Sequence, residues 1–393
     1  MSTENPVPKI RFQSLAELTR SQIDAIRSIP AHDQVHYPAL RATRPTSMFL
    51  DPAHFELEQQ KVFRRLPVAV ALSVTVQEPN SYVAQDGYGP PLLVTRDRAG
   101  KAHVFLNVCL HKGSKLVAAG EPRQGGRLSC PYHGWTWGVD GKLVGVARAE
   151  TFADLDRAQR DLVELPSREA GGIIFAILDP KAAPDFGLLH DDLVADLQAL
   201  DLAGQYLYGR RTFHLDANWK QVIEPFLEGY HVQRLHAQSV GPLFADVPTV
   251  VTRLGDHLRQ TSGKADFTPA DLEGAKNIHK TVTHAYLVFP NTVLVTSPYY
   301  MSVMFIMPDA VGRTTVDYHM LTLNPVDNPQ AEQLYKTSYE TVLGVFGNED
   351  FAAAETCYAG LRSGALDPID VVYCGLEQCI PMQYETLDKY LNA

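Results

Sequence analysis

Two short segments, each carrying one cysteine and one histidine, constrain this chain more than any other feature. Cys109 and His111 form the first pair, Cys130 and His133 form the second, and residues 112–129 separate them. Loop-like sequence follows both pairs. Two thiolates and two imidazoles on facing loops suit a [2Fe–2S] cluster with two Cys on one iron and two His on the other. We therefore predict a cluster at these four residues that accepts and passes single electrons.

A structural zinc ion is the alternative for this site, because zinc also takes two Cys and two His as ligands. Zinc motifs usually keep like ligands together, CxxC followed by HxxxH, whereas each pair here is mixed. Neutral imidazole in place of thiolate makes an iron–sulfur cluster less negative and easier to reduce. The mixed spacing favours the cluster, which would colour the protein red-brown where zinc would leave it colourless.

The size and charge of the chain exclude several function classes. At 393 residues it is long enough for two domains, and its net charge of −10 argues against nucleic acid and anionic membrane surfaces as partners. No apolar run reaches the ~20 residues that cross a bilayer, and residues 1–11 lack the apolar core of a signal peptide.

With two cysteines in the cluster, three of the five remain. An odd remainder is a poor disulfide framework, so we expect a cytoplasmic protein.

The pattern of helix-forming, strand-forming and turn residues divides the chain into three parts. Residues 1–47 hold an N-terminal helical segment, expected from Leu15 to Arg27. Short β-like runs between Gly, Pro, Asn and Asp fill residues 48–166, which contain both Cys/His pairs. Residues 167–393 mix helices with antiparallel strands, so we predict an α+β fold. Strands are expected at 67–74, 91–94, 104–108, 171–178, 208–216, 285–295, 301–307 and 314–323, and further helices at 191–200, 219–236, 269–277 and 331–361.

A second group of metal-ligating residues lies about a hundred residues downstream. On a helix, Glu224, Glu228 and His231 would share one face, with His236 close by if the helix loosens. Two His and a carboxylate from elsewhere would complete a 2-His-1-carboxylate iron(II) site with open positions for O₂ and substrate. Alternatively the two His are unrelated, one paired with Glu228 and one at a helix end. The upstream electron-transfer motif favours iron, and Pro225 predicts a break beside Glu224.

Taken together, these motifs resemble those of the Rieske non-heme iron oxygenases, the oxygenase components of ring-hydroxylating and demethylating systems. The resemblance covers nearly the whole chain. It implies an N-terminal all-β Rieske domain at 48–166, a C-terminal helix-grip catalytic domain at 167–393, and residues 1–47 packed on the latter. Asn218 and Glu228 are implied as catalytic residues. The motifs are Cys109-x-His111…Cys130-x2-His133-Gly-Trp and Asn218-Trp219-Lys220…Glu228-Gly-Tyr-His231-x4-His236.

The third iron ligand of the family is an Asp late in the chain, often in a Glu-Asp pair that opens a helix. Glu349 and Asp350 fit that pattern, so the resemblance implies Asp350 as a ligand beside His231 and His236. Read from the residues alone, Asn348 would cap a helix whose positive end Glu349 and Asp350 merely favour. Glu349 is the nearest alternative ligand, and Asp367 and Asp370 are weaker ones.

Three positions depart from the family pattern. Lys112 follows the first cluster His where the family usually has Arg, and residues 112–129 form a slightly longer segment than most. Glu228 stands where most members have an Asp that bridges a cluster His in one subunit to an iron-ligating His in the next. Its longer arm keeps the charge but alters the geometry, a form associated with members that act on quaternary ammonium compounds.

The resemblance implies a terminal oxygenase. A flavin reductase using NAD(P)H, with or without a ferredoxin, supplies electrons that pass from the [2Fe–2S] cluster through Glu228 to iron(II), where O₂ reacts with an organic substrate. A homotrimer is implied, because family members pass electrons between subunits. Apolar strands around 289–307 suggest an aromatic or alicyclic substrate for mono- or dihydroxylation. The alternatives are oxidative demethylation or monooxygenation of a quaternary ammonium or methoxy compound, and an electron carrier without catalytic iron.

Overall fold

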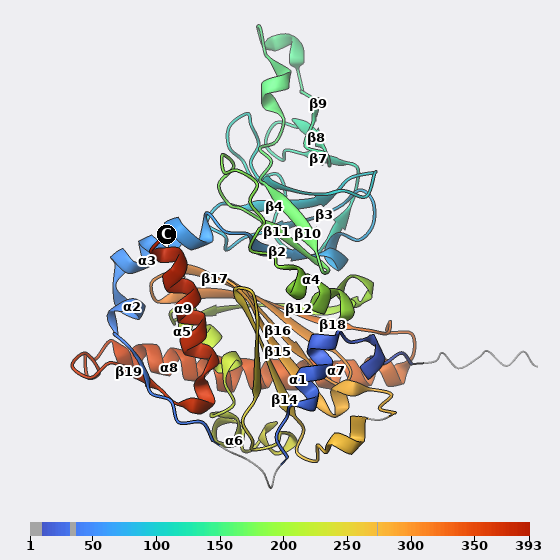
Figure 1. The fold of residues 1–393 in the computed structure, drawn as a ribbon. Coiled ribbons are helices and arrows are strands. Elements are labelled where there is room, and N and C mark those ends of the chain that lie inside the picture. The colour runs from blue at the N-terminus through green and yellow to red at the C-terminus, as the bar shows by residue number, and fades with distance from the viewer. Residues whose placement is uncertain (1–9, 32–36, 273) are drawn as a thin grey trace, which may run out of the picture.

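The structure, a computed structural model, describes residues 10–31, 37–272 and 274–393. Figure 1 shows a smaller all-β part, drawn at the top, that stands on a larger part in which helices surround one wide sheet. Within the described ranges, no helix combines the length and the apolar composition that a membrane span requires.

The all-β part contains three small antiparallel sheets. Its strands at Val68–Leu72 and Leu92–Arg96 are buried along their whole length, which suits their β-branched and apolar residues. Strands are therefore found at all four positions expected in this part. In strand order, the sheets are β5 (Ala102–Leu106), β4 (Leu92–Arg96), β3 (Ser81–Gln85) and β6 (Arg123–Gln124); β7 (Arg127–Ser129), β8 (Thr136–Gly138) and β9 (Leu143–Gly145); and β10 (Ser167–Ala170), β11 (Ile173–Ala176) and β2 (Val68–Leu72).

The sheet of β10, β11 and β2 extends across the expected division at residues 166 and 167. Ile173 of β11 lies opposite Leu72 of β2, and β10 pairs with β11. The chain thus returns to its first strand after the cluster loops, a long-range pairing that local sequence patterns do not encode. The domain limits at 47 and 166 stay a prediction.

The larger part is built on a seven-stranded antiparallel sheet, as expected for an α+β fold. The single strand expected at 285–295 is wrong: Pro290 and Asn291 form a turn between two strands, because proline lacks the N–H that a ladder needs. In spatial order the strands are β12 (Tyr206–Leu215), β18 (Arg313–Thr322), β17 (Met301–Ala310), β16 (Thr292–Thr296), β15 (Val282–Val288), β14 (His257–Gly263) and β13 (Val250–Leu254).

The two faces of this sheet bury different cores. Along β17, Met304 and Ile306 join one cluster, whereas Val303 and Phe305 join the other, as the two-residue period of a strand requires. Helices cover both faces (Figure 1). The helices that the structure describes are α1 (Arg20–Arg27), α2 (Ser47–Leu50), α3 (Pro52–Glu58), α4 (Asp191–Ala199), α5 (Trp219–Ile223), α6 (Val232–Leu235), α7 (Pro329–Val345), α8 (Ala352–Leu361) and α9 (Cys379–Leu391). Apart from the large sheet, β1 (Ala42–Arg44) pairs with β19 (Val371–Tyr373).

Three expected helices are shorter than their patterns predicted. The first divides into a 3-10 turn and α1, because Thr19 accepts a hydrogen bond from the backbone N–H of Gln22 and starts a new helix. Near residues 269–277 the structure has only the 3-10 turn Pro269–Leu272, and residue 273 lies outside the described part. The helix expected at 219–236 is interrupted: α5 ends at Ile223, a 3-10 turn follows, and Pro225 stands in its first turn, as its missing N–H requires.

A long helix expected at 331–361 is present as one continuous rod. α7 leads directly into a π-helical turn, η11 (Phe346–Phe351), and then into α8. π-Helical turns inside α-helices occur frequently at functional sites. No helix begins at Asn348, so the capping interpretation of Asn348 is wrong.

Candidate functional site

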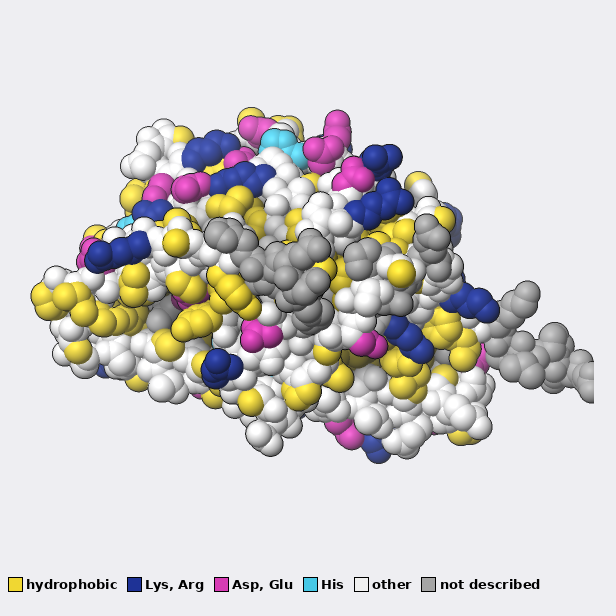
Figure 2. Space-filling view, turned by 60° about the horizontal axis from the view of Figure 1, so that its bottom comes forward, with side chains coloured by type: hydrophobic (Ala, Val, Ile, Leu, Met, Phe, Trp, Pro, Cys, Tyr) yellow, Lys and Arg dark blue, Asp and Glu magenta, His cyan; other side chains and the backbone are white. Residues whose placement is uncertain are grey.

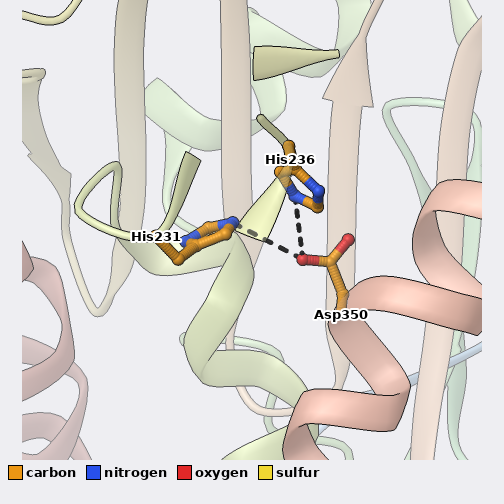
Figure 3. Close-up of side chains that lie close together, drawn as sticks. All are labelled: His231, His236 and Asp350. Atoms are coloured by element: carbon orange, nitrogen blue, oxygen red, sulfur yellow. Dashed lines mark ion pairs between the residues drawn. The ribbon is translucent and has the colours of Figure 1, made fainter. Parts of the chain in front are cut away.

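Three side chains predicted as iron ligands come together in the larger part. Atoms of His231, His236 and Asp350 lie within 4.8 Å of one another, the only such group of three or more His, Cys, Asp or Glu among the described residues. Oδ1 of Asp350 lies 3.4 Å from Nε2 of His231 and 3.2 Å from Nε2 of His236 (Figure 3). His236 and Asp350 are buried. Two imidazoles and one carboxylate that converge in this way fit the donor set of iron(II).

Short local structures position the two histidines. His231 precedes and His236 follows α6, a helix of a single turn, and their rings lie 4.9 Å apart between centroids. Asp350 comes from η11, on the far side of the group. The helix face predicted for Glu224, Glu228 and His231 is wrong, because the chain leaves the helical region after Leu227 and Glu228 is extended.

Each histidine has a carboxylate behind it. Glu228 Oε1 accepts a hydrogen bond from Nδ1 of His231 at 2.5 Å, and its Oε2 accepts from the backbone N–H groups of Tyr230 and His231. Glu349 Oε2 accepts from Nδ1 of His236 at 2.6 Å. Both Nε2 atoms are thereby directed toward Asp350. Such outer partners fix the orientation and tautomer of metal-ligating histidines.

The charges of this group favour a bound cation. Burial alone would lower the pKa of His231, yet hydrogen bonds to Asp350 and Glu228 raise that pKa to about 9. The pKa of His236 is also raised, because Asp350 and Glu349 outweigh the effect of burial, and the two histidines hold the pKa of Asp350 below its usual value. Protons thus occupy a place that a divalent ion would take, and ion binding releases them.

The remaining ligand candidates lie elsewhere. Glu349, the nearest alternative to Asp350, faces the outer nitrogen of His236 rather than the group itself. Asp367 accepts a hydrogen bond from Oγ1 of Thr46, a residue near the N-terminus that is not part of the group. Asn218 caps α5 by accepting from the N–H of Lys220 and donates to two backbone carbonyls. These hydrogen bonds hold the backbone around Asn218, and the catalytic role implied for Asn218 stays a prediction.

The four predicted cluster ligands lie in the all-β part. The His111 and His133 rings are 4.8 Å apart between centroids, and Nδ1 of each is buried without a hydrogen-bond partner in the described structure. Cys109 and Cys130 are free thiols and buried. Two imidazole nitrogens without partners and two buried free thiols are the donors that a cluster held by two Cys and two His requires.

The arrangement argues against a single zinc ion here. Ligands of one tetrahedral zinc ion lie about 2.0–2.3 Å from it and hence within about 4 Å of one another. No three ligand atoms of these residues meet even the wider limit of 4.8 Å that His231, His236 and Asp350 satisfy. Backbone N–H groups also surround the sulfurs. Burial acts to raise the pKa of Cys130, but N–H groups of His133 and Tyr132 outweigh it and lower that pKa.

The surroundings of the cluster ligands are aromatic and partly exposed. Trp135 stacks on the ring of His111 at 4.8 Å, almost parallel to it. Tyr132 lies against the ring of His133 and is 62% exposed. The edge of the site at His133 is therefore accessible to a second protein surface.

Comparisons with known proteins agree with this geometry. Residues 67–156 match the family "Rieske [2Fe-2S] domain", and residues 205–393 match "Ring hydroxylating alpha subunit (catalytic domain)". The carnitine monooxygenase oxygenase subunit of Escherichia coli K12 is 27% identical over 82% of this chain and 84% of its own length. The chloroplastic choline monooxygenase of Spinacia oleracea is 30% identical over 60% of this chain and 54% of its own.

The fold also has close counterparts among solved structures. A quaternary ammonium Rieske monooxygenase in complex with gamma-butyrobetaine aligns with a TM-score of 0.72 at 21% identity, covering 88% of this chain and 95% of the other. At that identity the likeness concerns the fold.

Proposed function

This chain belongs to the Rieske non-heme iron oxygenases, and we propose that its substrate is a small quaternary ammonium compound. As a terminal oxygenase it works with a Rieske [2Fe–2S] cluster, a mononuclear iron and O₂. The cluster supplies electrons one at a time, and the iron binds O₂ beside the substrate. We assign Cys109, His111, Cys130 and His133 to the cluster. To the iron we assign His231, His236 and Asp350, and the convergence of these three side chains carries the proposal of oxygenase chemistry.

Two observations support an ammonium substrate. The relatives named above are monooxygenases of carnitine and choline, which are both quaternary ammonium compounds. Aromatic rings also pack beside the helix that carries Asp350: between ring centroids, Phe226 lies 5.2 Å and Tyr318 5.9 Å from Phe346, which stands one turn before Asp350 on the same helix. Aromatic faces attract quaternary ammonium groups.

In the proposed reaction one atom of O₂ enters the substrate and the other leaves as water. The balance requires two electrons and two protons. The electrons come from NAD(P)H through a flavin reductase, with or without a ferredoxin. Attack at an N-methyl group yields an N-hydroxymethyl ammonium ion, which loses formaldehyde and a proton and leaves a tertiary amine, whereas attack elsewhere yields a stable hydroxylated product.

An aromatic or alicyclic substrate is the second candidate. The same rings of Phe226, Tyr318 and Phe346 would hold it, and the large subunit of anthranilate 1,2-dioxygenase from Acinetobacter baylyi is 30% identical over 49% of this chain. One experiment separates the two. O₂ uptake and product mass are measured with reductase and NAD(P)H for carnitine, gamma-butyrobetaine, choline and glycine betaine, and for anthranilate and naphthalene. Product only from the latter pair would overturn the ammonium assignment.

We also propose a head-to-tail homotrimer. The loop with Cys130 and His133 connects β7 to β8. The sheet of β7, β8 and β9 lies at the opposite end of the molecule from α6 (Figure 1). Electrons within a single chain would have to cross the whole molecule. The end of the molecule that carries α6 is turned toward the viewer in Figure 2, where hydrophobic side chains lie among charged ones, and Tyr230 and Leu243 are 59% and 57% exposed. That face suits contact with a neighbouring cluster.

Mixed subunits test this arrangement. A Cys130→Ser chain lacks the cluster and an Asp350→Ala chain lacks the iron, so each is inactive alone. If electrons pass between subunits, refolding or co-expressing the two together restores part of the turnover. Failure to recover activity in a verified mixed trimer would contradict transfer between subunits, and a monomeric mass in solution would contradict the trimer.

A further inference from the structure

Two small side chains interrupt the buried surface of the large sheet between two of its inner strands. Ala285 of β15 and Val295 of β16 are partly exposed, whereas the other residues of these two strands, which the structure describes throughout, are all buried. The two residues lie directly opposite one another in the antiparallel ladder, so their side chains stand together on one face. Solvent therefore reaches a spot inside the sheet and not only its edges.

The neighbours of this pair are packed on every side. Gln260 and Ser302 flank the pair in the ladder, one on each side, and both are buried. Leu287 and Val293 lie two residues away along the strands, hence on the same face, and are also buried. Protein interiors are close-packed, so accessible surface that is enclosed by packed side chains requires a hollow above it.

The space above Ala285 and Val295, which we call the central hollow, is on the face of the sheet that holds the segment of the iron ligands. Gln260 lies opposite Ala285 on this face and donates a hydrogen bond to the carbonyl of Phe226. Phe226 stands five residues before His231, and the 3-10 turn that contains Phe226 lies against β15. The central hollow is thus next to the chain that leads into the proposed iron site.

The ring of Phe226 connects this segment with the helix that carries Asp350. Ring centroids of Phe346 and Phe351 lie 5.2 Å and 6.1 Å from that of Phe226. Both belong to the π-helical turn that contains Asp350. The sheet, the segment of His231 and the helix of Asp350 therefore meet around Phe226, which places the central hollow beside the proposed iron site.

The floor of the central hollow determines which chemical group fits above it. Ala285 contributes a methyl group and Val295 an isopropyl group, and neither offers a charge or a hydrogen bond. A carboxylate or a hydroxyl would lose its hydration there without compensation. A trimethylammonium group presents only methyl groups at its surface, and the aromatic ring of Phe226 attracts its charge.

We propose that Ala285 and Val295 form the floor of the substrate chamber and set the size of the alkyl group that is brought to the iron. The inference rests on the proposed ammonium substrate for the identity of that group, a trimethylammonium group. The two residues are then specificity-determining: the floor accepts N-methyl groups and rejects larger N-alkyl groups.

Two variants change the depth of the central hollow in opposite directions, with choline and its N-triethyl analogue as probes. One methylene in an apolar pocket changes specificity by about 10–200-fold. Ala285→Leu fills the hollow and should raise KM for choline, and its Kd measured by titration calorimetry, at least about tenfold. Val295→Ala deepens the hollow and should raise kcat/KM for the triethyl compound at least about tenfold, a gain that a folding defect cannot produce.

The matched control is Val293→Ala. It makes the same change on the same strand and the same face, at a side chain that is fully buried. We expect it to leave the ratio of kcat/KM for the two compounds within about twofold of the wild type.

The melting temperature tests the hollow without any substrate. A larger side chain in a packed core costs stability and lowers the melting temperature by about 2–6 °C, whereas one that fills an existing space does not. Ala285→Leu should therefore melt close to the wild type. Ala71→Leu, the same change at a fully buried alanine of β2, should melt clearly lower.

The outcomes separate this inference from the proposed function. If ammonium compounds are oxidised but the two variants keep the N-alkyl preference of the wild type, the floor is wrong and the ammonium substrate stands. If only anthranilate or naphthalene is oxidised, the ammonium substrate is overturned, and an unchanged KM of Ala285→Leu for that compound would overturn the floor as well. With any substrate or none, a melting temperature of Ala285→Leu as low as that of Ala71→Leu would disprove the hollow.

Discussion

Glu349 accepts a hydrogen bond from Nδ1 of His236 at 2.6 Å, while the next residue, Asp350, lies 3.2 Å from the opposite nitrogen of the same ring. Two adjacent acids therefore hold one imidazole from both sides. Ser239 Oγ donates to the same oxygen of Glu349 at 2.7 Å and fixes its position. Glu349 thus positions the ring of His236, one of the proposed iron ligands.

Replacing Glu349 by Gln is expected to weaken iron binding while leaving the cluster in place. Loss of an outer partner of a metal-ligating histidine typically costs 10–100-fold in metal affinity or activity. Iron per chain after dialysis against a chelator measures the effect, with the visible spectrum as the readout of the cluster. Glu332→Gln, at an exposed position on α7, is the control. Unchanged iron retention in Glu349→Gln would contradict the role.

Asp350→Asn and His231→Ala are expected to abolish product formation without bleaching the protein. The full protein should contain about three irons per chain, two in the cluster and one at the catalytic site, and these variants about two. Cys130→Ser should give the reverse, a colourless protein that keeps the single iron. A variant at Asp350 that consumed O₂ in step with product would disprove its assignment as a ligand.

The carboxyl of Glu224 gives the fold a pH dependence. Desolvation raises its pKa from 4.5 to about 7, although Tyr384 and Tyr373 donate hydrogen bonds to it and oppose the shift. A carboxyl whose folded pKa is raised contributes stability below its unfolded pKa and loses it as the pH rises toward 7. Glu224→Gln should therefore match the wild type near pH 4.5 and exceed it at pH 8 by up to about 3 kcal/mol. Denaturant unfolding at both pH values measures this, and an equal offset at both would refute it.

A buried ion pair supports α5, the helix that precedes the proposed iron ligands His231 and His236. Lys220 Nζ donates to Glu58 Oε1 at 2.6 Å, both side chains are 0% exposed, and Trp219 donates to the other oxygen. Lys220→Met leaves a buried carboxylate without its counter-charge and is expected to cost about 3–5 kcal/mol of unfolding free energy. Adding Glu58→Gln should restore part of that loss. A double variant less stable than Lys220→Met would contradict the explanation.

The sequence was most informative where the chemistry depends on short spacing. The pairs Cys109/His111 and Cys130/His133 sit on tight loops, so their residue types and intervals alone indicated the cluster. His231 and His236 were likewise found from their spacing, although the helix predicted to carry them was wrong. Pro225 ends that helix, and the side chain of Glu228 satisfies backbone N–H groups that helical bonds would otherwise have used.

The contribution of Glu349 could not be obtained in this way. Glu349 accepts a hydrogen bond from His236, which lies 113 positions away in the sequence. The adjacent acids Glu349 and Asp350 look equivalent in the sequence. Only the rotation of the helix places Asp350 between the two Nε2 atoms and Glu349 beside the outer nitrogen of His236. Such differences arise from tertiary packing, which local patterns do not record.

The π-helical turn at Phe346–Phe351 determines the direction in which Asp350 points from the helix axis. Such a turn holds one residue more than a regular α-helical turn. Removing a single residue from it would leave an unbroken rod with the same partners at both ends, yet would swing Asp350 by about 100° around the axis. Over evolutionary time, a one-residue deletion here would convert an oxygenase into a well-folded protein unable to hold its metal.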